Sequence, residues 1–455
     1  MRIKNVDMLN GSLLKGILYF GIPLLFVSLI QNLFNAVDIM VLGAMADTNA
    51  VASVGATSAI THLLVNLAIG ISNGTKIVLS RLLGEREDDK ASKTVYTSII
   101  TSLILGVGVA VLGTSLSGVF LNITNCPAEI YDGAHTYLCI YFASVPAVLL
   151  YNFGSNILQV TGDSQRPLYY MIVSGLLNIV LNIILCLVLP NKAAAVAIAT
   201  AASQILGAFL VIRRILRMDG PCRLNIKSRG WNTGIFKKLL INGLPIGFTS
   251  ALYPLSNLQI QSSINSFGPA AIAGNSAMSN LDNIESAICS APWCAASGVF
   301  VGKNLGANSP KRVKRSMAYC IGISGILSIS ISLLLFAFSG PLLSLFLSND
   351  AEAIAYGQIR VLFVTLPYVI CAINTIFVTS IQAFGYAVFT TINSITSVLL
   401  FRVFWMNVIF PLSPSFHMLM LCFSVSWCMV AVLNLVFFSY IYFRKFKKGL
   451  IKKMG

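Results

Sequence analysis

The chain has 455 residues, of which 56% are apolar and only 10% are Asp, Glu, Lys or Arg. An average soluble protein has about 25% charged residues, and the mean hydropathy of this chain is +0.82. These values exclude a large soluble domain and predict an all-α polytopic membrane protein.

Twelve apolar runs follow one another along the chain, each long enough to cross a bilayer as a helix of about 20 residues. Short polar breaks separate most of them. The predicted spans are residues 14–43, 50–80, 94–120, 130–159, 167–190, 193–213, 236–265, 270–302, 316–347, 352–383, 386–410 and 416–443.

The basic residues predict the orientation of these spans. Of the 31 Lys and Arg residues, 27 fall in segments on one predicted side of the membrane, eight of them in residues 213–238 and five in residues 303–315. The opposite loops contain only Lys192. The positive-inside rule makes the basic side cytoplasmic and places both termini inside. The net charge of +16 is therefore a topology signal and does not indicate nucleic-acid binding.

The two halves of the chain repeat one another at an offset near 222 residues. Gly21-Ile22-Pro23 opens the first span, and Gly243-Leu244-Pro245 opens the seventh. Residues 159–162, Gln-Val-Thr-Gly, correspond to residues 382–385, Gln-Ala-Phe-Gly. An internal duplication of this kind predicts two similar lobes.

We predict an N-lobe over residues 1–217 with spans 1–6, and a cytoplasmic linker over residues 218–234. Spans 7–12 and a basic tail form the C-lobe, residues 235–455. Because each half has six spans and starts inside, the repeats are parallel. Parallel half-repeats with a site at their interface are typical of secondary transporters, which work by rocking one bundle against the other.

Asp38 lies in an otherwise uncharged apolar run, residues 16–45. A carboxylate at membrane depth costs a few kcal/mol or more, so it usually faces a bundle interior and has a function. Gln31, Asn35 and Asp38 fall at i, i+4 and i+7, which places them on one stripe of a helix. The alternative is that Asp38 lies near the helix end and reaches the headgroups.

These features resemble the multidrug and toxic compound extrusion (MATE) transporters along nearly the whole chain. The resemblance implies twelve helices in two lobes and export of organic, often cationic compounds in exchange for H+ or Na+. It also implies a coupling Asp in the first helix. The segments that carry it are Pro23 with Asn35-Ala36-Val37-Asp38, residues 52–55, the glycine-rich ends of spans 2 and 8, residues 159–166, and Asn283-Ile284-Glu285 followed by residues 301–307.

The resemblance also implies a cation-coupling site in the N-lobe. Asp38 matches the helix-1 acid, Asn178 a helix-5 Asn and Thr200 a helix-6 Thr, whereas Asn182 stands where the family has an Asp. Losing this carboxylate weakens the case for a hard cation more than for a proton, so we favour H+ over Na+. The amides are alternatively helix–helix hydrogen bonds, each contributing about 1 kcal/mol or less.

Polar side chains at helical spacing inside other spans are candidates for the substrate cavity. Asp282 and Glu285, one turn apart in span 8, are the candidates for attracting a cationic compound. They alternatively pair with Arg360 or Arg402, and His62 is alternatively a hydrogen-bonded packing residue. The predicted cavity residues are Gln31, Asn35, His62, Asn66, Asn152, Asn156, Asp282 and Glu285.

Three classes of function compete. A cation-coupled multidrug antiporter fits best, and a flippase for lipid-linked oligosaccharides or other lipids is the alternative. A flippase would need several basic residues to hold a pyrophosphate, and we expect few of these in the N-lobe. No HExxH, paired intramembrane Asp or Ser/His set indicates an enzyme. We expect a monomer in the bacterial inner or plasma membrane, with small organic substrates and lipids as partners and with no nucleotide, nucleic acid, metal or cofactor beyond the coupling ion, H+ or Na+.

Overall fold

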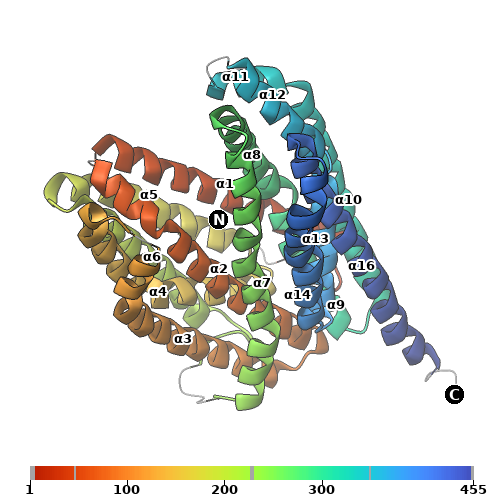
Figure 1. Cartoon of the computed structure of the whole chain (residues 1–455). Helices are drawn as coiled ribbons and strands as arrows, with labels where there is room; N and C mark the ends of the chain where they lie inside the picture. The colour runs from red at the N-terminus through yellow and green to blue at the C-terminus, as the bar shows by residue number, and fades with distance from the viewer. Residues whose placement is uncertain (1–5, 46–47, 125, 226–229, 348–349, 452–455) are drawn as a thin grey trace. The chain divides into compact units, whose positions relative to one another are not determined.

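The computed structural model describes residues 6–45, 48–124, 126–225, 230–347 and 350–451. Within helices, side chains are not described for residues 35–39, 42, 44, 45, 48, 59, 62, 253–256, 258 and 447–451. This described part contains helices and no strand (Figure 1).

The first seven helices are uninterrupted, whereas several of the later ones are divided into shorter α-helical and π-helical segments. The first seven are α1 Leu13–Met45, α2 Thr48–Glu85, α3 Asp88–Ile123, α4 Ala128–Val160, α5 Gln165–Val188, α6 Lys192–Arg217 and α7 Thr233–Asn265. The others are α8 Pro269–Cys289, α9 Ala291–Gly306, α10 Pro310–Ala337, α11 Ser339–Leu347, α12 Ala351–Arg360, η1 Val361–Thr365, α13 Tyr368–Ala383, α14 Ala387–Ser394, η2 Ile395–Leu400, α15 Phe401–Phe404, η3 Trp405–Ile409, η4 Phe410–Leu412 and α16 Phe416–Ile451.

Eleven stretches of the described residues have the length and apolar composition of membrane spans. Each of them overlaps a different one of the twelve spans predicted from the sequence, with differences at the ends. The remaining predicted span, residues 236–265, lies within the 33-residue helix α7. The prediction of an all-α polytopic membrane protein is confirmed.

Four predicted spans, numbers 8 to 11, are divided into shorter helical segments, and in spans 8 and 10 the division lies at a proline. In span 8, α8 ends at Cys289 and α9 begins at Ala291, with Pro292 in its first turn. In span 10, α12 continues as the π-helix η1, and α13 begins after Pro367. Proline has no N–H and its ring crowds the preceding turn, so a helix breaks or changes its hydrogen bonding there.

The internal repeat is visible in the backbone. Arg86 and Asn308 are the described non-glycine residues with positive φ, at 58° and 52°, and they follow α2 and α9 respectively. Gly162 and Gly385, after α4 and α13, both have φ of 92°. A residue in the left-handed region commonly terminates a helix. Corresponding helices in the two halves therefore end in the same way, about 222 residues apart.

The compact units of the structure do not coincide with the predicted lobes. Unit 1 contains Met1–Asp7 and Phe26–Gly247, and unit 2 contains Met8–Leu25 and Phe248–Gly455. The first part of α1 thus belongs to unit 2, and the first part of α7 belongs to unit 1. The predicted linker, residues 218–234, also falls in unit 1.

Unit 1 is built around α4, which contacts α2, α3 and α6 (Figure 1). Its apolar core includes Leu138, Phe142 and Phe153, all with 0% exposure.

Glycines explain why the start of α7 belongs to unit 1. A Cβ added to Gly70 of α2 would lie 2.1 Å from the Cα of Gly247, and one added to Gly74 would lie 2.3 Å from the carbonyl oxygen of Leu239. A Cβ on Gly243 would lie 2.3 Å from the carbonyl oxygen of Ile71. Small residues let membrane helices approach this closely. The backbones of α2 and α7 are therefore in direct contact.

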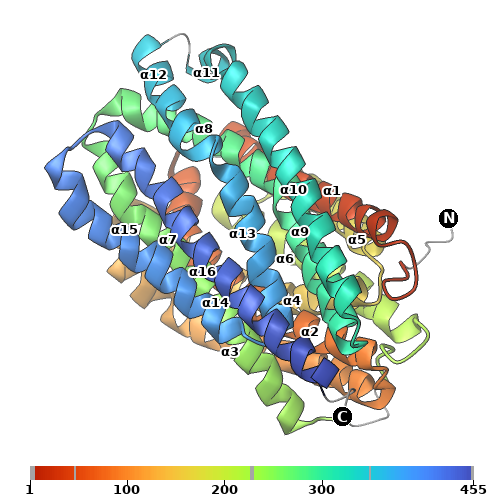
Figure 2. The same ribbon diagram turned by 90° about the vertical axis from the view of Figure 1, so that its right-hand side faces the viewer.

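In unit 2, aromatic residues of α9 pack against the start of α1. A Cβ on Gly21 would lie 2.6 Å from the ring of Trp293 in α9, and the Phe20 and Phe300 rings are 5.9 Å apart, edge to face. In the same unit, α13 lies alongside α10 and α16 (Figure 2). The lobes predicted from the sequence place the start of α1 in the N-lobe. Its assignment to unit 2 depends on tertiary packing, which the sequence repeat does not show.

Candidate transport sites

A chain of amide and hydroxyl groups connects α5 and α6 in unit 1. Asn182 Nδ2 donates to Asn178 Oδ1 at 3.3 Å, and Asn178 Nδ2 donates to Thr200 Oγ1 at 3.5 Å. Asn178 and Asn182 are only 6% and 1% exposed. The structure therefore brings together three of the four residues predicted for cation coupling. Their oxygens are able to accept a hydrogen bond from an acid or to coordinate a cation.

The fourth predicted coupling residue, Asp38, lies in α1, but its side chain is outside the described residues. The backbone places its helical turn relative to α5. A Cβ on Gly175 would lie 1.8 Å from the ring of Phe34, so α1 and α5 touch at this level. Short connections make consecutive helices antiparallel, so these two odd-numbered helices run in the same direction. Residue 38, one turn beyond Phe34, is thus level with Asn178, about one turn beyond Gly175.

The other predicted cavity residues of unit 1 have varied surroundings. Asn156 Nδ2 donates to Ser72 Oγ of α2 at 2.9 Å, whereas Asn152 Nδ2 donates to the Val148 carbonyl of its own helix at 2.8 Å. Gln31 is exposed and Asn66 is half-buried. The Asn35 and His62 side chains lie outside the described residues.

In unit 2, Asp282 forms an ion pair with Arg360. Arg360 Nε donates to Asp282 Oδ2 at 2.8 Å, and its Nη1 donates to Asn275 Oδ1 at 2.7 Å. Thr365 Oγ1 donates to the other carboxylate oxygen at 2.7 Å. The side chains of Asp282 and Arg360 are 11% and 9% exposed, respectively. Of the alternatives that the sequence leaves open for Asp282, the structure therefore contains the ion pair with Arg360.

Glu285 lies one turn further along α8 and is completely buried, at 0% exposure. Its Oε1 accepts hydrogen bonds from Ser332 Oγ at 2.6 Å and from Ser328 Oγ at 3.2 Å, both on α10. Its Oε2 has no hydrogen-bond partner in the described part of the chain. Glu285 is thus held by neutral hydroxyl groups, in contrast to Asp282.

The second intramembrane arginine of unit 2 has neutral partners in the hydrogen bonds that the structure resolves. Arg402 Nε donates to Ser426 Oγ at 3.2 Å, and its Nη1 donates to Asn257 Oδ1 at 2.9 Å. Its guanidinium carbon is 4.5 Å from the centre of the Phe423 ring, and that of Arg360 is 5.6 Å from the same ring. Cation–π contacts of this kind stabilise buried guanidinium groups.

Four residues that form hydrogen bonds with Asp282, Arg360 or Glu285 were not predicted from the sequence. Asn275 lies two turns before Asp282 on the same face of α8, and helical spacing is the signal that identifies it. Ser328 and Ser332 fall at i and i+4 in an apolar span, which is the same signal on α10. Thr365 has no such signal, because the π-helical segment that presents it was not predicted.

The sequence pattern of the MatE family matches residues 23–184 and 245–406. The chain is a member of the MatE family. The second matched segment begins at residue 245, 222 residues after the first, which agrees with the predicted internal repeat. The protein is therefore a multi-pass membrane transporter.

Curated relatives of this MatE-family protein are similar over most of their length. The probable multidrug resistance protein YoeA of Bacillus subtilis is 27% identical over 395 residues, covering 83% of each chain. A protein of Shewanella oneidensis named as an FAD transporter is 23% identical over 381 residues, covering 80% of this chain and 83% of its own. Relatives of this chain are thus named for multidrug resistance in one case and for FAD transport in another.

A solved structure shares the fold. The structure of a MOP superfamily transporter from Pyrococcus furiosus has a TM-score of 0.88 and covers 97% of this chain and 98% of its own, at 20% identity. At this identity the similarity establishes the fold alone.

Proposed function

We propose that this protein is a cation-coupled antiporter that exports organic, often cationic compounds, with H+ favoured over Na+ as the coupling ion. Asp38 is the coupling carboxylate in this proposal, and Asn178, Asn182 and Thr200 are its polar neighbours. Membership of a transporter family and the parallel internal repeat support a rocking mechanism.

The observation that carries the proposal is the buried amide–hydroxyl chain of α5 and α6. A row of hydrogen-bonding groups costs free energy in an apolar bundle unless its members are paired, and these lie level with residue 38 of α1. A carboxyl group there would exchange a proton, and neighbouring amide oxygens would accept its hydrogen bond. Asn182 adds no second charge to the set, which favours a proton over a hard cation such as Na+.

Organic cations are the proposed substrate class, partly because YoeA is named as a multidrug resistance protein. In unit 2, the Asp282–Arg360 pair has no net charge, so Asp282 alone supplies little attraction for a cation. We therefore assign the attraction to the carboxylates of Asp38 and Glu285, while Asp282 orients Arg360.

A cargo with a pyrophosphate group, such as a lipid-linked oligosaccharide, is the second candidate. The relative from Shewanella oneidensis is named for FAD, which also contains a pyrophosphate. Two buried arginines in unit 2, Arg360 and Arg402, favour an anionic cargo. Asp282 neutralises Arg360, however, so we prefer organic cations.

Everted membrane vesicles test the proposal. Dye efflux is measured with a pH gradient or a Na+ gradient imposed separately, and vesicles lacking the protein give the background. We expect a pH gradient alone to drive accumulation of a cationic dye. Transport driven only by Na+ would contradict the coupling ion, and transport of a pyrophosphate-linked lipid without dye transport would favour the flippase.

A further inference from the structure

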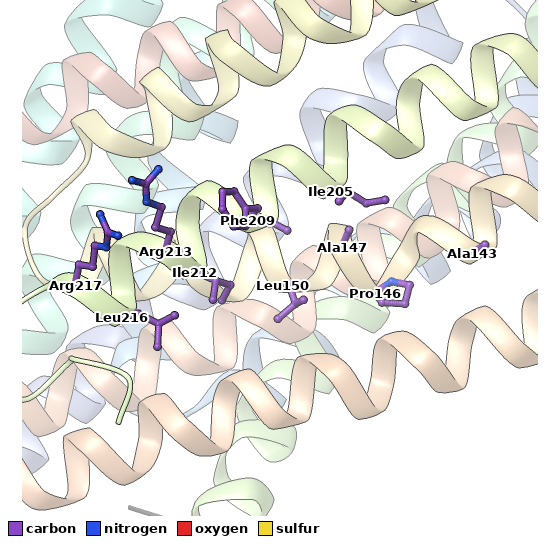
Figure 3. A pocket seen from close by; sticks show the side chains of 11 residues that line it. Ala143, Pro146, Ala147, Leu150, Ile205, Phe209, Ile212, Arg213, Leu216 and Arg217 are labelled. Carbon is purple, nitrogen blue, oxygen red and sulfur yellow. The ribbon is translucent and has the colours of Figure 1, made fainter. Parts of the chain in front are cut away.

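An open groove of about 680 Å³ lies between α4 and α6 of unit 1 (Figure 3). One end of the groove is apolar, and the other carries two guanidinium groups, those of Arg213 and Arg217. None of the predicted coupling or cavity residues lines it. The groove is therefore separate from the proposed transport sites.

The apolar part of the groove is a trough with a floor of small residues. Ala143 and Ala147 on α4 and Ala208 on α6 line it with methyl groups only. Phe209 stands beside the trough and is 58% exposed. The α6 lining residues recur at i, i+3, i+4 and i+7, so they form one face of the helix. The trough has the apolar chemistry of an acyl chain-binding surface.

The two arginines have no acidic partner among the residues that the structure describes. Arg213 and Arg217 are exposed, one turn apart on α6, and no carboxylate of the described residues lies within 4.0 Å of either. Lysines on α3 are different, because Lys90 and Lys93 pair with Glu87 and Asp89 at 3.0 and 2.7 Å. The arginine pair thus keeps its full positive charge available at the mouth of the groove.

The length of the groove matches one leaflet of a membrane. From Ile205 to Arg217 the rise of α6 is about 18 Å, at about 1.5 Å per residue. Half of a typical hydrocarbon core is about 15 Å. Arginines at the end of α6, on the predicted cytoplasmic side, would therefore lie at headgroup level while the trough lies among acyl chains.

We propose that this groove binds one anionic phospholipid, with an acyl chain in the trough and the phosphate between Arg213 and Arg217. Basic pockets between membrane helices on the cytoplasmic side commonly bind anionic headgroups. The proposal is independent of the exported substrate and of the coupling ion.

Native mass spectrometry of the purified full-length protein tests whether the positive charges of Arg213 and Arg217 bind the anionic lipid. Phosphatidylglycerol and phosphatidylcholine with identical acyl chains are added, and the retained lipid is counted. Each basic residue near an anionic lipid contributes a factor of about five, so Arg213→Gln with Arg217→Gln should weaken phosphatidylglycerol retention about 25-fold. Lys90→Gln with Lys93→Gln removes the same charge elsewhere and should leave retention unchanged. Equal losses in both double variants would contradict a specific site.

A second variant tests the trough. Ala147→Phe fills the floor and should reduce phosphatidylglycerol retention although both arginines remain. Val107→Phe adds the same ring to the exposed face of α3 and serves as its control, with thermal unfolding confirming that both variants fold. Unchanged retention in Ala147→Phe, or competition by inorganic phosphate as strong as by the lipid, would overturn the acyl-chain site. Equal retention of the two lipids by the unmodified protein would overturn the proposal altogether.

Discussion

Asp282 and Glu285 are one turn apart on α8, and their surroundings give them different energetic roles. Asp282→Asn should destabilise the protein by about 3–5 kcal/mol, because it leaves Arg360 buried without its counter-ion. Denaturant unfolding of the purified protein measures this loss. Adding Arg360→Gln to Asp282→Asn removes the uncompensated charge and should recover most of the stability. A double variant less stable than Asp282→Asn would contradict the ion-pair role.

Glu285→Gln should have the opposite effect on stability. The amide oxygen still accepts hydrogen bonds from Ser328 and Ser332, and the substitution removes a carboxylate whose partners are neutral. We expect equal or greater stability in the same unfolding experiment, together with weaker export of cationic dyes than of neutral ones. A large loss of stability would show that the Glu285 carboxylate has an ionic partner.

Asp38→Asn should abolish active efflux while leaving the protein folded and inserted. An amide has the same volume, removes the cost of a charge within the membrane, and is unable to bind and release a proton. Efflux from everted vesicles and thermal unfolding measure the two effects. Gradient-driven efflux by the folded variant would move the coupling role to Glu285 or Asp282, and would favour the headgroup interpretation of Asp38.

Sequence spacing identified the acids of this protein but not the residues that pair with them. Asp38, Asp282 and Glu285 are conspicuous because charge is rare in apolar runs. Arg360 is conspicuous for the same reason, yet nothing in the sequence distinguishes it from Arg402 as the partner of Asp282. That choice depends on the packing of α12 against α8, which brings together residues 78 positions apart.

Among the elements, the predicted spans lie on the observed helices, but α3 begins six residues before its predicted start and α16 ends eight residues beyond its predicted end. Interruptions inside spans were not predicted. Hydrophobicity defines the length of a span, but an interruption depends on local backbone hydrogen bonding, which changes at a proline in spans 8 and 10 and without one at η2 in span 11. Pro146 lies within the continuous helix α4, while Pro292 and Pro367 lie at breaks. The same residue type therefore has different outcomes in different packing environments.

Glycine contacts between α2 and α7 make a prediction at the level of helix packing. Gly70→Ala introduces a Cβ about where the Gly247 backbone lies, and overpacking of this kind costs about 1–3 kcal/mol. Gly108→Ala on α3 is the matched control, because no atom lies within 4 Å of its added Cβ. Thermal unfolding should show a loss for Gly70→Ala and none for Gly108→Ala. Equal transition temperatures would mean that α2 and α7 separate at little cost.

Across the whole molecule, two helices belong to both compact units. α1 passes from unit 2 to unit 1 after Leu25, and α7 passes from unit 1 to unit 2 after Gly247. These points are 222 residues apart and each follows the repeated Gly-x-Pro motif by two residues. The sequence predicts the duplication, but it does not predict to which unit the start of α1 or of α7 belongs. The motif glycine lies against α2 in the second copy, at Gly243, and against Trp293 in the first copy, at Gly21.

The membrane orientation of the chain is a prediction that single cysteines test. Of the 31 basic residues, 27 lie on one predicted side, so the connection between α2 and α3 should be cytoplasmic and the one before α16 external. In a variant lacking the ten native cysteines, Ser413→Cys should react with a membrane-impermeant maleimide in intact cells. Asp88→Cys, at a position that is also exposed in the structure, should react only after permeabilisation. The reverse pattern would place the arginine end of the α4–α6 groove on the outside and invert the direction of transport assigned to the protein.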